Sequence, residues 1–312
     1  MNECRPSLVR GLWALTYREL KKWLKDPIML VMFILQPLIW MGLLGKSMNI
    51  QGLFSSSHLS GINIPDIRIP GGLVNPPIDG VITIPGVMLS QQLQRILSEV
   101  GGAVMQNTFG VTDYFSYLAV GMISMIVTTT TMFSGMSIVW DRRLGFLDKI
   151  ISTPVSRAAI IFAKILNGTL RAMFQATVVL TLAYLLGLRL SPTFTLLNLL
   201  GMYAAIFLMG VGLSSIFIAF SIRATRLERP MQFVNLITMP LMFASNTFFP
   251  IKLMPEWMQA IASVNPLTYL TDITRNLTIL NVETAALIWD FIYLGLFAAV
   301  FATIGIILSW RY

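Results

Sequence analysis

The sequence predicts an all-α integral membrane protein with six transmembrane helices. Hydrophobic residues make up 55% of its 312 residues and charged residues only 12%, whereas soluble domains carry about 25% charged residues. A membrane-spanning helix needs about 20 consecutive apolar residues. Six charge-free runs are close to this length or exceed it, namely Pro27–Gly45, Tyr114–Trp140, Ala172–Leu188, Leu190–Ile222, Pro230–Ile251 and Phe291–Trp310.

Several kinds of chemistry have no support in the residue counts. Cys4 is the only cysteine, which rules out a disulfide within the chain and a thiol-based zinc site. His58 is the only histidine, which argues against histidine-dependent catalysis. Gly42–Ser47 resembles the end of a phosphate-binding loop, but that pattern needs glycine where Trp40 stands. We therefore expect no catalytic, metal or cofactor site in this chain.

The distribution of basic residues predicts the orientation in the membrane. With a cytoplasmic amino terminus, the inner segments hold 14 Lys/Arg and 6 Asp/Glu; these segments are 1–27, 141–157, 223–229 and 311–312. Short loops rich in Lys and Arg stay on the cytoplasmic side. We therefore expect a multi-pass protein of the cell (plasma) membrane with both termini inside. The cytoplasmic membrane face then accounts for the excess of basic residues, so we expect no nucleic-acid partner.

The amino-terminal region, residues 1–27, predicts an interfacial helix before the first span at 28–45. Apolar and basic side chains occupy opposite faces of residues 7–26, as in helices that lie in the membrane interface. This helix either anchors the chain on anionic lipid or docks a partner. Glu19 falls within the apolar face, where contact with lipid is costly, and it therefore favours a protein contact.

Residues 46–113 predict a small extracytoplasmic insert. Ile62–Ile64 and Val81–Ile84 are β-like runs in a segment rich in proline and glycine. An amphipathic helix follows, with an apolar face formed by Leu89, Leu93, Ile96, Leu97 and Val100. That face is expected to pack on the insert, on the membrane surface or on a second subunit.

Polar residues mark spans two and three of the permease region at 114–312. The third helix is expected at Ser156–Gly187, where Arg157, Lys164 and Arg171 recur every seven residues along an inner polar stripe. This stripe either extends toward lipid phosphates or faces a protein partner or a water-filled path. In span two, Thr128–Thr131 either line a transport route or bond to carbonyls of their own helix.

The segment before the last span, residues 252–280, predicts a re-entrant helical hairpin. Pro255 suits the first turn of one helix, and Asn265-Pro266 breaks the chain before a second. Irregular backbone at membrane depth has to be buried against protein. The spacing of Asp272 and Arg275 predicts an ion pair. The candidate hairpin residues are Asn265, Pro266, Tyr269, Asp272 and Arg275.

The loop at 141–157 predicts a short helix that contacts another protein. Asp141 is a favourable residue at or before its amino end, and Thr153-Pro154 stops it. Its apolar face is formed by Phe146, Leu147, Ile150 and Ile151, and its charged rim by Arg142, Arg143 and Lys149. Such a helix fits a groove on a partner; a loop resting on the lipid surface is the alternative.

Two of these stretches together resemble a known family. The run Asp141–Arg157 resembles the cytoplasmic loop of type 2 ATP-binding-cassette (ABC) transporter permeases, especially the daunorubicin-resistance permease-like branch. The stretch Phe249–Arg275, with Asn265-Pro266 inside it, is similar to the segment before the last span in that family. The resemblance covers residues 7–45 and 114–312. The insert departs from it, as do the two arginines that follow Asp141.

The resemblance implies a six-helix half-transporter of an ABC exporter. It implies a cytoplasmic coupling helix, a separate ABC ATPase subunit that binds ATP and Mg²⁺, and a second permease copy, either identical or a paralogue, in a membrane-lipid environment. The expected coupling residues are Glu19, Asp141, Arg142, Arg143, Phe146, Leu147, Lys149 and Ile150. The branch suggests an amphiphilic, drug-like or lipid-like substrate, with polysaccharide as the alternative. A non-transporting assembly or scaffold protein and a channel are further alternatives.

Overall fold

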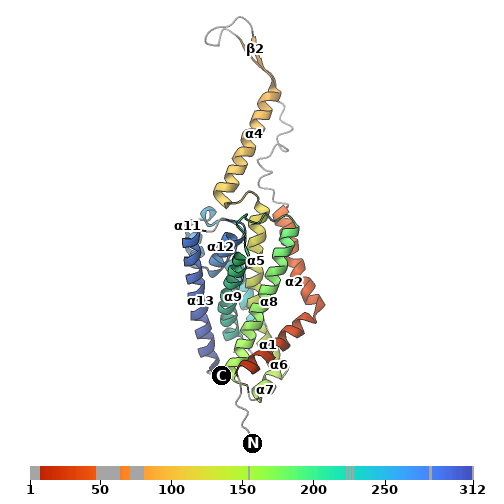
Figure 1. Cartoon of the computed structure of the whole chain (residues 1–312), viewed down its shortest axis with the longest axis vertical. Helices are drawn as coiled ribbons and strands as arrows, with labels where there is room; N and C mark the ends of the chain where they lie inside the picture. Colours follow the sequence, from red (N-terminus) through yellow and green to blue (C-terminus); the bar gives the residue numbers. More distant parts are fainter. Residues whose placement is uncertain are drawn as a thin grey trace.

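In a computed structural model, the protein is a bundle of long helices with an arm projecting from one end (Figure 1). The structure describes residues 8–46, 64–70, 81–153, 155–222, 224, 226, 228–280 and 283–310. We call the end of the bundle that bears the arm the α4 end. The opposite end, where α1 (Leu8–Leu24) and α7 (Phe146–Ile151) lie, is called the α7 end.

Four helical runs in the described part of the chain are long and apolar enough to cross a membrane. They are Gly86–Arg143, Ala158–Leu185, Leu196–Ser221 and Thr284–Leu308. In the described residues one shorter helical run is also apolar: α2 (Pro27–Trp40), which continues into the π-helix η1 (Met41–Lys46). Helix α10 (Glu228–Phe243) begins with charged residues and is less apolar. The chain is therefore a helical multi-pass membrane protein. The total of six spans and the predicted domain boundaries stay predictions.

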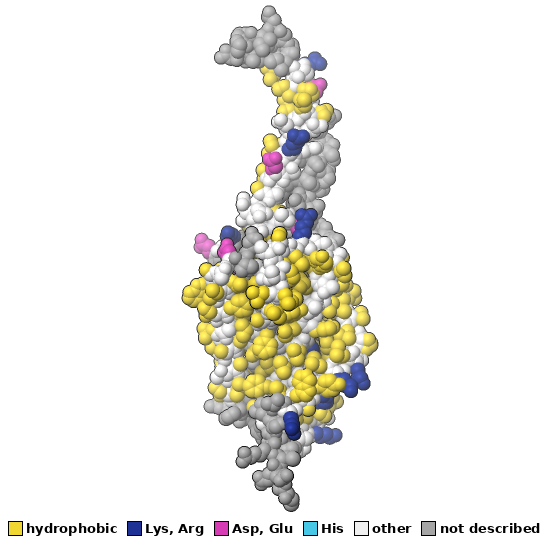
Figure 2. Space-filling view, in the orientation of Figure 1, with side chains coloured by type: hydrophobic (Ala, Val, Ile, Leu, Met, Phe, Trp, Pro, Cys, Tyr) yellow, Lys and Arg dark blue, Asp and Glu magenta, His cyan; other side chains and the backbone are white. Residues whose placement is uncertain are grey.

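The surface of the bundle agrees with a membrane environment. Figure 2 shows hydrophobic side chains across the middle of the bundle on the face in view. On this face Lys and Arg lie at both ends of the bundle and on the arm, and the acidic side chains in view lie at the α4 end and on the arm. An apolar surface of this kind can face the hydrocarbon core of a membrane, because it places no charged side chain in contact with lipid.

Helix α5 (Tyr114–Ser134) lies at the centre of the bundle and is buried along most of its length. It packs against α8 (Arg157–Leu185), α9 (Leu196–Ser221) and α12 (Pro266–Thr278). Small residues allow these close approaches. A Cβ at Gly168 of α8 would lie 2.6 Å from the Ser134 side chain.

The helix starts are set by polar caps. Asp113 accepts from the Ser116 amide at the start of α5, and Ser156 accepts from the Ala159 amide at the start of α8. The predicted start of the third helix at Ser156 is therefore confirmed. Helix α13 (Thr284–Trp310) begins before the charge-free run. It therefore includes Asp290, which the sequence analysis had placed outside the last span.

The arm consists of a β-hairpin, the helix α4 (Gly86–Val104) and the π-helix η3 (Met105–Phe109). Strands β1 (Ile67–Pro70) and β2 (Val81–Ile84) pair antiparallel, with Ile67 opposite Ile84. The amphipathic helix and the strand at 81–84 are thus confirmed. The sequence analysis missed β1, and its other β-like run begins outside the described residues.

Candidate functional site

Helix α1 lies across the α7 end and packs on α8. Its contact face includes Thr16, Glu19 and Trp23, all of which are buried. The Trp23 ring meets Phe174 of α8 edge to face, with 5.5 Å between the ring centroids. The apolar face of this helix therefore contacts other helices of the same chain, which is the protein contact expected from Glu19; docking of a partner stays a prediction.

Buried charges from three helices meet beneath α1 and form what we call the ion cluster: Glu19, Asp141, Lys164 and Arg171. The Lys164 ammonium lies 3.0 Å from a Glu19 carboxylate oxygen and also donates to Asp141 of α6 (Met136–Arg143). Arg171 donates to the Glu19 carbonyl oxygen at 3.1 Å. Lys164 and Arg171 of the polar stripe therefore point into protein. The side chain of Arg157 lies outside the described part of the chain.

The ion cluster is a strong local constraint because its charges are shielded from solvent. Lys164 is only 5% exposed and Asp141 only 3%. Burial alone would raise the pKa of the Glu19 carboxyl, but the positive charge of Lys164, supported by Arg18 and Arg171, outweighs burial and holds this pKa below its usual value. Removing one partner from such a pair costs about 3–5 kcal/mol, since the other charge is left buried.

The short helix of the predicted coupling loop is present but begins later than expected. Asp141 belongs to the last turn of α6, not to the amino end of the short helix. The chain then turns at Gly145, whose φ of 65° favours glycine, and α7 follows. The expectation that Asp141 begins the coupling helix was therefore wrong. Its carboxylate is turned inward and neutralises Lys164.

The surface of α7 also differs from the predicted apolar face. The Arg18 guanidinium covers one side of the Phe146 ring, 3.6 Å from its centroid. Ile150 is buried within the chain, whereas Leu147 is half-buried and Lys149 is exposed. Leu144, in the turn before α7, is 69% exposed. The surface available to a partner thus centres on the α6–α7 turn, where Arg143 is also exposed.

Two further contacts connect α7 to the bundle. Arg142 donates to the carbonyl oxygens of Ile222 at 2.6 Å and Ala224 at 3.4 Å, just after α9. On the other side, a Cβ at Gly11 of α1 would lie 3.1 Å from Val155. The turn and the residues after α7 are consequently held by contacts with α1 and with the end of α9.

The predicted helical hairpin lies at the α4 end. Its two helices are α11 (Glu256–Ala262) and α12, and the break at Asn265-Pro266 is confirmed. The Asn265 amide donates to the carbonyl oxygens of Leu241 and Ala244, each at 2.7 Å, and its side-chain oxygen accepts from the Leu267 amide. One asparagine therefore caps the end of α10 and the start of α12 together.

A second buried cation lies behind this hairpin, in what we call the arginine cluster: Tyr117, Asn246, Thr247, Asp272 and Arg275. Arg275 donates to the main-chain oxygens of Asn246 at 2.6 Å, Thr247 at 2.9 Å and Tyr117 at 3.2 Å. Its guanidinium also stacks over the Tyr117 ring, 3.4 Å from the centroid. The predicted Asp272–Arg275 ion pair is wrong for the described structure, since Asp272 instead accepts from the Asn246 amide.

The remaining hairpin residue, Tyr269, fastens α12 to α13. Its ring stacks on Tyr293 with 3.9 Å between the centroids. The Tyr269 hydroxyl donates to the Ser263 carbonyl oxygen, and the Tyr293 hydroxyl to that of Val264. Both tyrosines thus satisfy carbonyls at the turn of the hairpin.

The threonines of span two mostly bond to their own helix, as the structural alternative expected. Thr128, Thr129 and Thr131 donate to carbonyls one turn earlier in α5. Thr130 is the exception and donates to the Gln175 side chain of α8. Three of these hydroxyls are therefore satisfied within α5, and Thr130 alone among the four links α5 to α8.

Several residues of these clusters were missed by sequence reasoning. Tyr117 and Asn246 hold Arg275 through main-chain oxygens, and main-chain acceptors leave no residue signature. Trp23 lies on the apolar face of residues 7–26, and that pattern does not reveal its contact with Phe174. Leu144 carried a usable signal, because it is an apolar residue beside a glycine between two helices.

Comparison with known proteins identifies the family. The profile described as ABC-2 type transporter matches residues 10–279. The chain is 30% identical over 168 residues to a protein of Pyropia yezoensis named as a transport permease, ycf38, covering 53% of this chain and 56% of that one.

Two other relatives carry names from drug resistance. The daunorubicin resistance ABC transporter permease protein DrrB1 of Streptomyces coeruleorubidus is 29% identical over 177 residues, which cover 57% of this chain and 61% of that protein. YbhR of Escherichia coli K12, named as a multidrug ABC transporter permease, is 26% identical over 53% of this chain and 44% of its own. The chain spans about half the length of the curated relatives it matches. Because the family profile covers most of its residues, this chain belongs to the ABC-2 type transporter family, whose members are permease subunits of ABC transporters.

Proposed function

We propose that this chain is the permease half of an ABC exporter that moves an amphiphilic substrate. In this proposal a separate ATPase subunit binds ATP and Mg²⁺, and a second permease copy completes the transporter. Membership of the ABC-2 family supports an ATPase partner in general. The relatives named for daunorubicin resistance and multidrug transport support a drug-like or lipid-like substrate over a polysaccharide.

The observation that carries the proposal is the position of α7 beside the ion cluster. Leu144 and Lys149 are exposed on the α6–α7 turn and helix, where a partner can reach them. Directly behind them, Lys164 bonds to both Glu19 and Asp141. Motion of a bound ATPase would therefore pass to α1, α6 and α8 through buried contacts and not through a loose loop.

The orientation in this proposal has α7 and both termini in the cytoplasm and the arm outside. It is tested with single cysteines at Ser98 of α4 and Ser152 after α7, both exposed, in a Cys4→Ser background. An impermeant thiol reagent added outside intact cells should label Ser98→Cys only. Labelling of Ser152→Cys from outside at the same rate would contradict the orientation.

The coupling role is tested by truncating the Phe146 ring. Phe146→Ala removes the surface that Arg18 covers, and loss of an interface aromatic commonly costs about 2 kcal/mol or more. We expect weaker co-purification of the ATPase or less transport per ATP hydrolysed. Phe207→Ala, at an exposed position of α9, is the matched control and should behave as wild type. Wild-type association and transport in Phe146→Ala would refute the coupling assignment.

A further inference from the structure

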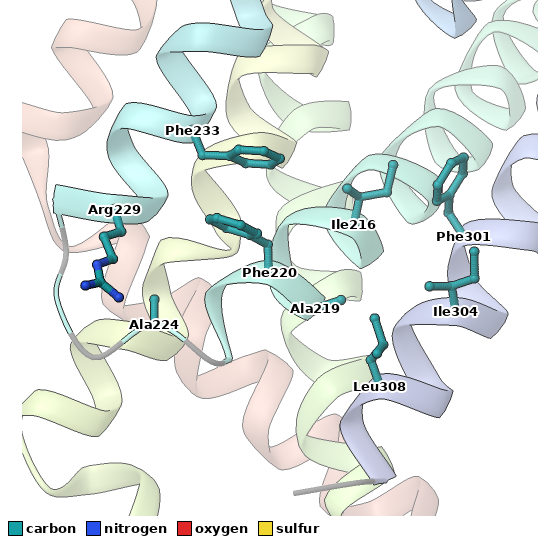
Figure 3. A pocket seen from close by; sticks show the side chains of 9 residues that line it. All are labelled: Ile216, Ala219, Phe220, Ala224, Arg229, Phe233, Phe301, Ile304 and Leu308. Atoms are coloured by element: carbon teal, nitrogen blue, oxygen red, sulfur yellow. The ribbon is translucent and has the colours of Figure 1, made fainter.

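An apolar groove opens on the side of the bundle toward the α7 end (Figure 3). Its walls come from α9, α10 and α13, and its volume is about 480 Å³, within the range of ligand pockets. The lining residues are Ile216, Ala219, Phe220, Ala224, Arg229, Phe233, Phe301, Ile304 and Leu308. Figure 3 shows side chains from α9 and α10 on one side and from α13 on the other.

The walls of this groove are suited to a hydrocarbon chain. Phe220 and Phe233 stack with 4.0 Å between their ring centroids and form one wall. Phe301 and Ile304 of α13 form the other. Ile304 is exposed on the outside of the bundle, so the groove is open to the lipid that surrounds a membrane protein. A chain from that lipid can enter without crossing a polar barrier.

Among the described residues that line the groove one is charged, Arg229, at the end nearest the α7 end. Arg229 is exposed. Ala224, beside it, lies on the loop whose carbonyl oxygen accepts from Arg142. A cation at one end of an apolar slot matches an amphiphile whose anionic headgroup lies at the membrane surface and whose chain points inward.

A second groove on the same helix lacks this charge. It lies toward the α4 end, has a volume of about 560 Å³ and is lined by residues of α10 and of the α11–α12 hairpin, none of them charged. The α10 residues in the two grooves are Arg229, Phe233, Leu236, Ile237, Pro240 and Leu241. At 3.6 residues per turn they fall within an arc of about 140°. Both grooves thus open along one face of α10.

We propose that the groove at Arg229 is a binding site for an anionic membrane amphiphile, with the headgroup at Arg229 and the acyl chain between Phe220 and Phe301. This inference rests on the proposed function and specifies that its amphiphilic substrate is anionic. The uncharged groove along the same face of α10 would accept the chain but not select the headgroup. Of these two grooves, the one at Arg229 would therefore be the one that selects for negative charge.

The test uses two probe lipids that differ only in the headgroup. The purified full-length chain is placed in phosphatidylcholine nanodiscs with either phosphatidylglycerol or phosphatidylcholine that carries a diazirine in the acyl chain. After illumination, peptide mass spectrometry locates the labels. We expect labels on Phe220, Phe301, Ile304 or Leu308, with phosphatidylglycerol favoured about fivefold, the effect of one basic side chain near an anionic headgroup.

Two variants separate this site from a general attraction to the basic surface. Arg229→Gln should abolish the preference for phosphatidylglycerol in the charged groove. Arg226 is an exposed arginine on the loop before α10 and does not line the groove. The Arg226→Gln variant should therefore keep the preference for phosphatidylglycerol. Labels in the second groove, at Ile261 or Leu236, should not depend on the headgroup in any of the three proteins.

Three results would overturn the proposal. One is equal labelling by both probes in the wild-type groove. Another is an equal loss of preference in Arg226→Gln and Arg229→Gln. The third is the absence of label from the groove while Leu296 of α13, an exposed residue outside both grooves, is labelled. Because labelling needs no ATPase, a protein that binds as expected but transports nothing would refute the proposed function and not this site.

Discussion

The ion cluster and the arginine cluster both bury a cation, but they satisfy it in different ways. Lys164 is neutralised by carboxylates from α1 and α6, and these partners are side chains. Arg275 donates instead to three main-chain oxygens and stacks on a tyrosine ring. At the α7 end paired charges hold separate helices together, whereas at the α4 end the donors of Arg275 hold the backbone at Asn246 and Thr247 against α12 and α5.

This difference bears on how the molecule can move. Ion pairs between side chains tolerate small shifts of the helices that carry them, because long side chains can follow. Main-chain acceptors allow no such adjustment. A Cβ at Gly121 of α5 would lie 2.2 Å from the Thr247 carbonyl oxygen. The backbone at Thr247 is therefore also in close contact with α5. We therefore expect the α4 end to act as a fixed point and the α7 end as the moving one.

The largest expected effect comes from removing the cation of the ion cluster. Lys164→Met leaves Glu19 and Asp141 buried, with Arg18 and Arg171 as the cations that remain near Glu19, and should destabilise the fold by about 3–5 kcal/mol. The midpoint of thermal denaturation of the purified protein measures this. Lys149→Met, at an exposed position of α7, is the control and should shift the midpoint little. Equal shifts in both variants would mean that the ion cluster contributes no more than a surface charge.

A smaller effect is expected when the arginine cluster keeps its positive charge but loses the arrangement of N–H donors that arginine provides. Arg275→Lys retains a cation that cannot reach all three carbonyl oxygens, and each buried acceptor left without a donor costs about 1–3 kcal/mol. We expect a loss of about 2 kcal/mol in the same denaturation measurement. Arg95→Lys on the exposed face of α4 is the control. A fully stable Arg275→Lys would show that charge, and not donor geometry, matters at this end as well.

The smallest effect is expected at the shared cap of the hairpin. Asn265→Ala removes the donor to Leu241 and Ala244, and loss of a helix cap typically costs about 1 kcal/mol. Amide hydrogen exchange should accelerate in α12 and at the end of α10 together. In Asn198→Ala, which removes a cap contact at the start of α9, only α9 should exchange faster. Acceleration in α12 without α10 would show that the two helices are not capped jointly.

Sequence reasoning located the hairpin well because its signals are local. Asn265-Pro266 cannot continue a helix, and proline at the first position of the next helix is favourable. The ion cluster was only half predicted. The seven-residue spacing of Lys164 and Arg171 showed a polar stripe, but their partner Glu19 lies 145 residues from Lys164. Spacing reveals which face is polar and does not reveal what meets it.

The errors have physical reasons too. Asp141 looked like a helix start, yet the turn at Gly145 divides the loop and leaves Asp141 on the preceding helix. Asp272 and Arg275 have the spacing of an ion pair, but main-chain oxygens close to Arg275 compete for its donors. Pairing rules for exposed helices do not include such acceptors, because backbone groups within a helix are already bonded.

The central claim is that the ion cluster carries the motion of an ATPase partner into the membrane helices, and Glu19→Gln tests it most directly. This change keeps the shape of the side chain and removes the charge that pairs with Lys164. The measurement is the number of fluorescent phosphatidylglycerol molecules transported per ATP hydrolysed in proteoliposomes that contain the permease and its co-purified ATPase, relative to wild type. We predict that the ATPase still binds and hydrolyses ATP while this ratio falls about tenfold, as expected for a charge-assisted contact of about 1.5 kcal/mol. An unchanged ratio would contradict the claim.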